Sequence, residues 1–175
     1  MANYVQNKGL YEARREHDAC GIGAVVNIDG KSDHSIIQYG KEIILNLHHR
    51  GAAGSDEVTG DGAGILFNIP HDFFKKQLKN TDLPEPKREV PAKNDCLGPL
   101  ALQAEPVIKQ LFIDGVNFQD RQLENKLYLV RKKAENKILK TLAENAVDFY
   151  ISSMSCKTIC YKGMFMAWQL FAYYP

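Results

Sequence analysis

A short apolar run near the start of the chain constrains the fold more than any other feature of the sequence. Residues 22–28 read IGAVVNI, are rich in β-branched side chains, and follow the charged segment YEARREHDA. Asp29-Gly30 comes next and is a typical turn dipeptide. A run of this kind between a polar segment and a turn is typical of a β-strand. We therefore expect residues 22–28 to form a strand that a tight turn closes.

A helix is predicted directly after this strand. Ser32 or Asp33 can cap it, because either side chain can accept a hydrogen bond from a free backbone amide of the first turn. Gly51 follows the end of the pattern, as glycine often follows a helix. The apolar positions fall on one helical face: Ile36, Ile37, Ile43, Ile44 and Leu47.

The rest of the chain divides into strands, helices and loops. Five glycines predict a loop over residues 51–64, and four prolines with mixed charges indicate a linker or exposed loop over residues 81–99. We expect the apolar segment that ends at Pro175 to need a covering element or chain. A strand is predicted over 65–69, followed by a short helix from Pro70 that buries Phe73, Phe74 and Leu78. Further along the chain we predict a strand over 107–113 and a hairpin of 147–154 with 158–161. Between them, a helix is predicted over 118–145, with an apolar stripe at Leu123, Leu127, Val130, Ala134, Ile138 and Leu142.

Charge and hydropathy exclude several classes of protein. The net charge is +1, so no overall charge attracts the chain to nucleic acid or an anionic membrane. The helix over 118–145 carries seven Lys or Arg and four acidic residues, which we interpret as a solvated helix face. No apolar run approaches the roughly 18 residues that span a bilayer, and residues 1–19 lack the apolar stretch of a secretory signal. We expect a cytoplasmic protein without a membrane or nucleic-acid partner.

The four cysteines do not form a disulfide or metal-binding pattern. Cys20, Cys96, Cys156 and Cys160 are too few and too scattered for a disulfide framework. The pair Cys156 and Cys160 lacks the second pair of ligands that a zinc site needs, and no histidine is near it in the sequence. We therefore predict no metal site and interpret this pair as buried structural residues.

Cys20 stands between the charged leader and the apolar run, and two kinds of site could explain it. A dinucleotide site at Gly21-x-Gly23 would need a preceding strand and a third glycine, and both are missing. The glycines of residues 60–64 likewise lack the Gly-Lys-Ser/Thr that holds phosphate. The alternative is an N-terminal nucleophile. Cleavage after Ala19 would free the α-amine of Cys20, whose ordinary pKa of about 7.7–8.0 allows it to act as base beside its own thiol.

Longer stretches of the sequence resemble a known family. HDACGIGAVV, at residues 17–26, and HHRGAAGSDEVTGDGAGILFNIPHDFF, at residues 48–74, are similar to the opening of the class II glutamine amidotransferase domain of glutamate synthase. The resemblance resumes, in the same order, in LGPLALQAEPVIKQLFI, LENKLYLVRKKAENKI and DFYISSMSCKTICYKGMFMAWQLFAYYP. It implies an α+β fold of the N-terminal-nucleophile hydrolase type, in which two packed antiparallel sheets are flanked by helices, here incomplete.

The resemblance also implies roles for individual residues. Cys20 matches the catalytic nucleophile, exposed when a leader of residues 1–19 is removed, and residues 20–175 match part of the amidotransferase domain. Arg50 and Gly51 match the element that shapes the site beside the nucleophile, and Asp61 matches a structural loop. The implied reaction is hydrolysis of glutamine to glutamate and ammonia, which is transferred to 2-oxoglutarate. Possible partners are the remaining synthase domains or subunit, and FMN and an iron–sulfur cluster are expected only there, with no cofactor in this chain.

Two departures from the family matter for the expected activity. Around residues 86–88 the chain passes directly from LPEP to REVPAKNDCLGPL, where family members have a further block, so we expect a deletion junction. After YYP the family continues to HxRFST and Asn-Gly-Glu segments that clamp the substrate and build the oxyanion hole. We therefore expect this chain alone to hydrolyse glutamine near background. A non-catalytic fragment or interaction module, and a stand-alone amidotransferase with another acceptor, are the alternatives.

Overall fold

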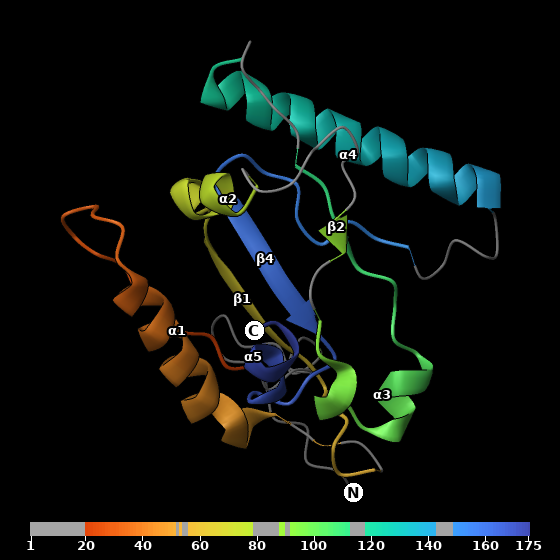
Figure 1. The fold of residues 1–175 in the computed structure, drawn as a ribbon. Helices are drawn as coiled ribbons and strands as arrows, with labels where there is room; N and C mark the ends of the chain where they lie inside the picture. Colours follow the sequence, from red (N-terminus) through yellow and green to blue (C-terminus); the bar gives the residue numbers. More distant parts are fainter. Residues whose placement is uncertain are drawn as a thin grey trace, which may run out of the picture.

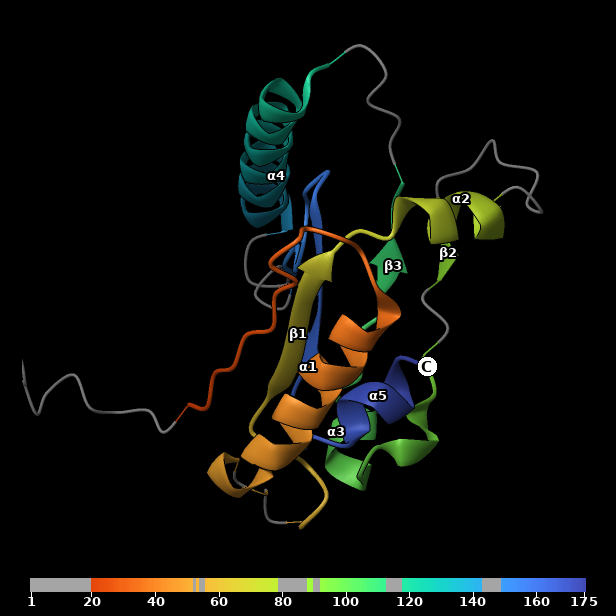
Figure 2. The same cartoon turned by 90° about the vertical axis from the view of Figure 1, so that its left-hand side faces the viewer.

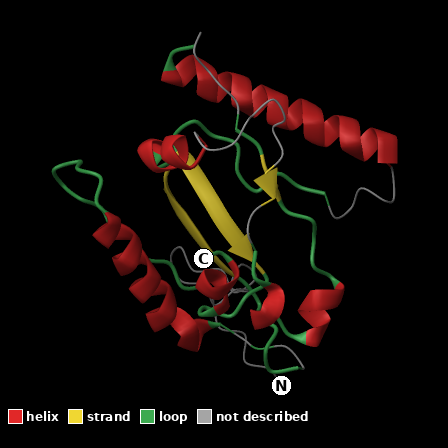
Figure 3. Cartoon of the chain, in the orientation of Figure 1, coloured by secondary structure: helices red, strands yellow, loops and turns green. Residues whose placement is uncertain are grey.

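The computed structural model of this chain combines helices with short antiparallel sheets, an α+β composition (Figures 1 and 3). It describes residues 20–51, 53, 56–78, 88–89, 92–112, 118–142 and 149–175. The elements in chain order are α1 (His34–Asn46), η2 (Leu47–Arg50), β1 (Ala63–Asn68), α2 (His71–Leu78), β2 (Arg88–Glu89), η3 (Asn94–Cys96), α3 (Pro99–Gln103), β3 (Lys109–Gln110), α4 (Asp120–Leu142), β4 (Thr158–Gly163) and α5 (Gln169–Tyr173).

The first helix begins where its capping residue predicts. Asp33 Oδ1 accepts a hydrogen bond of 2.7 Å from the backbone amide of Ser35. Hydrogen bonding from the side chain of Ser35, and then from its backbone, holds the pKa of the Asp33 carboxyl below its usual value. The helix ends in the single turn η2, with Gly51 as its C-cap in extended conformation. Its inner face packs on β1, where the side chain of Ile65 reaches Gly40. The predicted helix is confirmed.

A ribbon of two antiparallel strands, β1 and β4, forms the centre of the fold, with α1 along one side of it (Figure 2). Ile65 lies opposite Tyr161 and Phe67 opposite Ile159, so these side chains share one face. Leu66 points to the other face and is exposed. The positions predicted for the two strands are confirmed. The predicted hairpin of 147–154 with 158–161 is wrong: the described residues 149–154 form no strand, and β4 pairs with β1, which supplies the matching apolar row.

The strand predicted over residues 22–28 is also wrong. These residues carry no regular hydrogen-bonded structure, and Ile22, Val26 and Ile28 are 91%, 80% and 97% exposed. A strand exists only where a neighbour accepts and donates its backbone hydrogen bonds, and no described strand pairs with this segment. The turn that follows is confirmed, because the amide of Gly30 donates to the carbonyl of Asn27 at 3.0 Å. Gly30 has φ +68°, a conformation that glycine adopts without strain.

The best-buried part of the molecule lies at the C-terminal end. Phe165, Leu170 and Tyr173 are 7%, 1% and 2% exposed and form the core cluster, with Ile44, Ile65 and Tyr161 packed against it. The aromatic end of the chain is therefore the core of the described structure, and the covering element that the sequence led us to expect is present in the chain itself, as α1 and β1 pack on this cluster through Ile44 and Ile65. Trp168 is the exception, since it remains 45% exposed.

The remaining elements match their predictions unevenly. The charged helix is confirmed as α4, but none of its described residues is buried, so its apolar stripe is only partly covered. The strand predicted over 107–113 shortens to β3, which pairs with β2 inside the segment predicted as a linker. In α2, Phe73 is 55% exposed and only Phe74 is half-buried; the side chain of Leu78 lies outside the described residues. Among the described helices, none is long and apolar enough to cross a membrane.

Candidate active site

Cys20 lies at the beginning of the described chain, next to the end of α1. Its side chain is exposed. The following residue, Gly21, packs against Leu47, the first residue of η2: a Cβ added at Gly21 would lie 2.9 Å from Leu47 Cδ2. Gly23 packs in the same way against Ile43, one turn earlier on α1. The glycines on both sides of Ile22 thus let the segment that carries Cys20 lie directly on the helix that ends in Arg50.

Arg50 and Gly51 follow Leu47 in the same turn. Arg50 is the last residue of η2, and its side chain lies outside the described residues. The amide of Gly51 donates to the carbonyl of His48 at 3.1 Å. A Cβ at Gly51 would lie 3.4 Å from Asp61 Oδ1, so the glycine-rich loop comes back beside the end of η2. The structure therefore brings the backbones of Cys20, Gly51 and Asp61 to one end of α1.

The loop that carries Asp61 is built around a carboxylate. Asp56 Oδ1 accepts hydrogen bonds from the amides of Val58, at 3.2 Å, and Thr59, at 2.8 Å, and Oδ2 accepts one from the Thr59 hydroxyl at 2.6 Å. The bond from the Thr59 hydroxyl is the main reason that the pKa of Asp56 is lowered, because it favours the charged form. Gly60 forms a β-bridge with Ala53, so the loop is tied to the chain just after Gly51.

Two of the other thiols are held in their protonated form. Burial, reinforced by nearby acidic residues, raises the pKa of Cys96. Burial, followed by the carboxylate of Glu124, raises the pKa of Cys156 to about 11. Thiols with a raised pKa are poor nucleophiles at neutral pH, since the thiolate is the reactive species. Within the described ranges, no group of three or more His, Cys, Asp or Glu side chains could hold a metal ion.

Sequence reasoning missed two residues that shape this region. Asp56, which organises the loop, was not singled out, and neither was Gln169, which is 1% exposed and contacts the same loop. The signal for Gln169 was its place as the one amide side chain in the apolar run MAWQLFAYY. An open hollow of about 550 Å³ lies elsewhere, against β1 and β4, and is lined by Tyr150, Cys160 and Lys162 among others rather than by Cys20.

Comparison with known proteins identifies the family. The model of the class II glutamine amidotransferases matches residues 20–89 and 85–175. Similar proteins include the large chain of NADPH glutamate synthase of Bacillus subtilis, 35% identical over 95% of this chain, and the ferredoxin-dependent glutamate synthase of Cyanidium caldarium, 35% identical over 91%. The NADH glutamate synthase of Saccharomyces cerevisiae is 33% identical over 99%.

This chain spans only a small part of those relatives, 13% of the first two and 10% of the yeast protein. The family match nevertheless covers most of the chain and begins at Cys20. The resemblance found in the sequence, to the amidotransferase domain of glutamate synthase, is thereby confirmed. The chain belongs to the class II glutamine amidotransferases.

Proposed function

We propose that this chain is the glutaminase part of a glutamate synthase, with Cys20 as the nucleophile. The observation that carries the proposal is that the family match begins at Cys20. The next residue, Gly21, packs on Leu47, which begins the turn that contains Arg50. The ammonia released from glutamine would pass to 2-oxoglutarate in the synthase part. That part, with its FMN and iron–sulfur cluster, is the proposed partner, and we propose a cytoplasmic location.

The proposed chemistry needs the α-amine of Cys20 to be free, so residues 1–19 must be removed. The amine takes the thiol proton while sulfur attacks the carboxamide carbon of glutamine. Collapse of the tetrahedral intermediate breaks the C–N bond, and the amine returns the proton to the leaving nitrogen, which departs as ammonia. Water then opens the thioester and gives glutamate and the free thiol.

Arg50 and Gly51 are assigned the role of shaping the site. Gly51 lies beside Asp61, whose Oδ1 would be in ordinary contact, at 3.4 Å, with a Cβ at this position. The N-terminal-nucleophile sandwich of two antiparallel sheets is the proposed complete fold, to which the β1–β4 ribbon and α1 would contribute. A non-catalytic module is the second candidate, favoured by the exposed row of Ile22, Val26 and Ile28 beside the nucleophile.

The internal deletion near residues 86–88 is also a proposal. The family match is split into two segments that meet at residues 85–89, which supports a junction there. The alignment with the Bacillus chain runs over 206 positions, more than the 175 residues of this chain, and therefore contains gaps on this side. A chain with the junction keeps Cys20 and the HRG element in its first segment and the C-terminal core in its second.

The test uses three forms of the purified chain and an electrophilic analogue of glutamine such as a γ-diazoketone. The forms are the chain with Cys20 at its N-terminus, the chain that retains residues 1–19, and the first form with Cys20→Ala. We expect a single addition at Cys20, slowed by glutamine, only in the first form. Labelling that is indifferent both to leader removal and to glutamine would support the non-catalytic module. Ammonia release from glutamine, measured on the same samples, reports turnover independently.

A further inference from the structure

Gln169 is a polar side chain inside the apolar core. It is 1% exposed, between the core residues Phe165 and Leu170. Its Nε2 donates to the carbonyl of Val58 at 2.7 Å and to the carbonyl of Cys96 at 2.8 Å, and its Oε1 accepts from the amide of Met166 at 2.7 Å. Both donors of the amide and its carbonyl oxygen are thus used, as burial requires.

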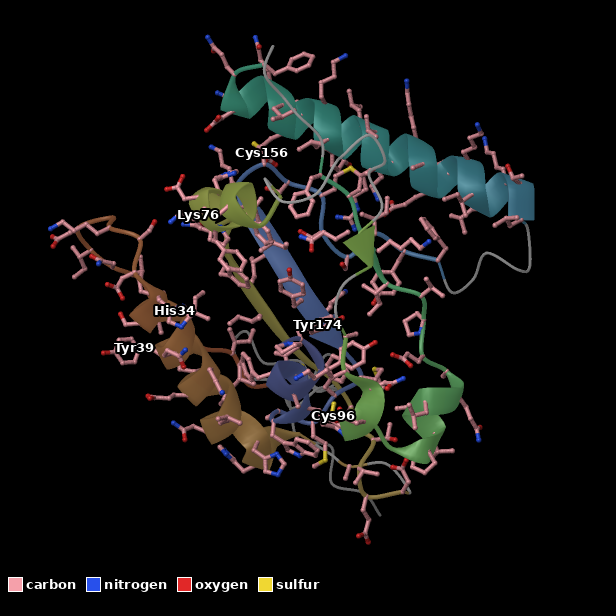
Figure 4. The ribbon with its side chains drawn as sticks, viewed as in Figure 1. His34, Tyr39, Lys76, Cys96, Cys156 and Tyr174 are labelled. Atoms are coloured by element: carbon pink, nitrogen blue, oxygen red, sulfur yellow. The ribbon has the colours of Figure 1, made fainter. Side chains whose placement is uncertain are left out.

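These three bonds join segments that are far apart in the sequence. Val58 belongs to the loop that leads to Asp61, Cys96 ends η3, and Met166 begins the turn before α5. Cys96, labelled in Figure 4, lies beside α5, and its backbone carbonyl accepts the hydrogen bond from Gln169. One side chain therefore sets the distance between the candidate site loop and the core.

The loop is held on both sides of Thr59. Before Thr59, the carbonyl of Val58 is bound by Gln169. After it, Gly60 is buried against the peptide bond between Phe165 and Met166, and any side chain there would overlap that backbone. Asp61, the next residue, lies against Gly51. Residues 165–169 therefore determine where Asp61 stands beside the end of η2.

We infer that Gln169 is a positioning residue of the amidotransferase site: it fixes the loop of residues 56–61, and through Asp61 it fixes the place of Gly51. The role of Gln169 in catalysis rests on the proposed function. The coupling between Gln169 and the backbone near Gly51 is measured separately. Gln169 does not touch the reacting atoms and acts through the loop.

Two substitutions separate positioning from simple core packing. Gln169→Glu keeps the shape, but once ionised its carboxylate has no donor for the carbonyls of Val58 and Cys96. When protonated, the introduced carboxyl group regains one O–H donor. Gln169→Met fills a similar volume and has no donor at any pH. Gln103→Glu makes the same chemical change at an exposed position of α3, and Leu170→Ala removes core volume next to Gln169 without touching its hydrogen bonds.

The measurement is backbone hydrogen exchange on the full chain, corrected for intrinsic rates, at about pH 9 and at about pH 5, because burial raises the pKa of the introduced carboxyl group. We expect both Gln169 variants to lose about 10- to 100-fold of protection in peptides covering residues 47–51 and 56–62 at the higher pH, with β1 and β4 little changed. Protection in the Gln169→Glu variant should recover partly at acid pH, and the Gln169→Met variant should show no recovery. Gln103→Glu should match the wild-type chain.

Three outcomes overturn the inference. The first is loss of protection that is equal in the loop and in β1–β4, as expected for Leu170→Ala. The second is unchanged protection near Gly51 despite a loosened loop, and the third is identical pH profiles for the two Gln169 variants. Labelling of Cys20 by the glutamine analogue is read on the same proteins. Its absence in the wild-type chain would refute the proposed function, while the exchange data would still decide the role of Gln169.

Discussion

The contact at Gly60 gives the sharpest prediction of stability. Gly60 is buried, and a Cβ there would overlap the carbonyl carbon and oxygen of Phe165 and the amide nitrogen of Met166. These are backbone atoms next to the core, so they cannot rotate away as the end of a side chain could. Overpacking in a tight interior typically costs about 1–3 kcal/mol. We expect Gly60→Ala to lie at the upper end of that range, about 3 kcal/mol, because the loop must leave the core or the turn before α5 must move.

Gly40→Ala is the matched control. Gly40 is inside α1, and its added Cβ would lie 3.4 Å from Ile65 Cδ1, an ordinary contact. Alanine favours a helix interior by about 0.5–1 kcal/mol relative to glycine. The same substitution should therefore stabilise the protein at one position and destabilise it at the other.

Urea unfolding followed by circular dichroism measures both effects. With a slope of about 2 kcal/mol per molar urea, the midpoint of Gly60→Ala should fall by about 1.5 M at unchanged slope. The midpoint of Gly40→Ala should rise by a few tenths of a molar. A Gly60→Ala protein within about 0.5 kcal/mol of the wild type, the range of an ordinary surface substitution, would show that the loop is not held against residues 165–166. The positioning argument for Gln169 would then lose its second anchor.

Three further predictions concern the thiols. Intact mass of the mature protein should show a chain that begins at Cys20; a chain that retains Met1 would lack the free amine. In the processed chain, Cys20 should react with the glutamine analogue ahead of Cys96, Cys156 and Cys160, and equal labelling of all four by peptide mapping would count against a formed site. Because the pKa of Cys156 is raised from 9.0 to about 11 in the folded state, its contribution to stability is present below pH 9 and is lost as the pH rises to about 11. In Cys156→Ser, the free energy of unfolding, measured by urea titration under reducing conditions, should fall less between pH 9 and about 11. An identical dependence on pH in the two proteins would contradict this prediction.

Local features of the fold could be predicted from the sequence because their causes are local. Asp33 caps α1 through an amide two residues away, and Gly30 supplies the positive φ of its own turn. The long helix α4 follows from a periodic pattern that repeats along 23 residues. In each case the residues that decide the structure are neighbours in the sequence.

Strand pairing and the core depend on residues that are distant in the sequence. The run that forms β4 was predicted as a strand, but its partner is β1, from the first half of the chain, because Ile65 and Phe67 offer the complementary face. Similarly, the aromatic end was predicted to need a covering element or chain, but the sequence did not identify it; Ile44 and Ile65, far away in the sequence, pack against the cluster that contains Leu170 and Tyr173. No local pattern distinguishes a segment that becomes the core from one that covers a partner.

The candidate site shows the same division. Cys20, Arg50 and Gly51 come from sequence motifs, and the structure places the backbones of Cys20 and Gly51 at one end of α1. Gln169 could not be predicted, because its importance lies in contacts with Val58 and Cys96 that only folding creates. Asp56 was missed although its contacts with Val58 and Thr59 are local. Motifs indicate the candidate chemistry, and tertiary contacts show which residues hold the surrounding backbone in place.

Residues 22–28, predicted as a strand, have one property of a strand and lack another. Gly21 and Gly23 face α1, while Ile22, Val26 and Ile28 are exposed, so alternate residues point to opposite sides, as in a strand. The alternation of sides that is typical of a strand is therefore present in the conformation. What is missing is a hydrogen-bonded neighbour among the described residues, and pairing is the one property of a strand that its own residues do not encode. The same glycines that weaken the run as a strand allow Cys20 to approach the end of α1.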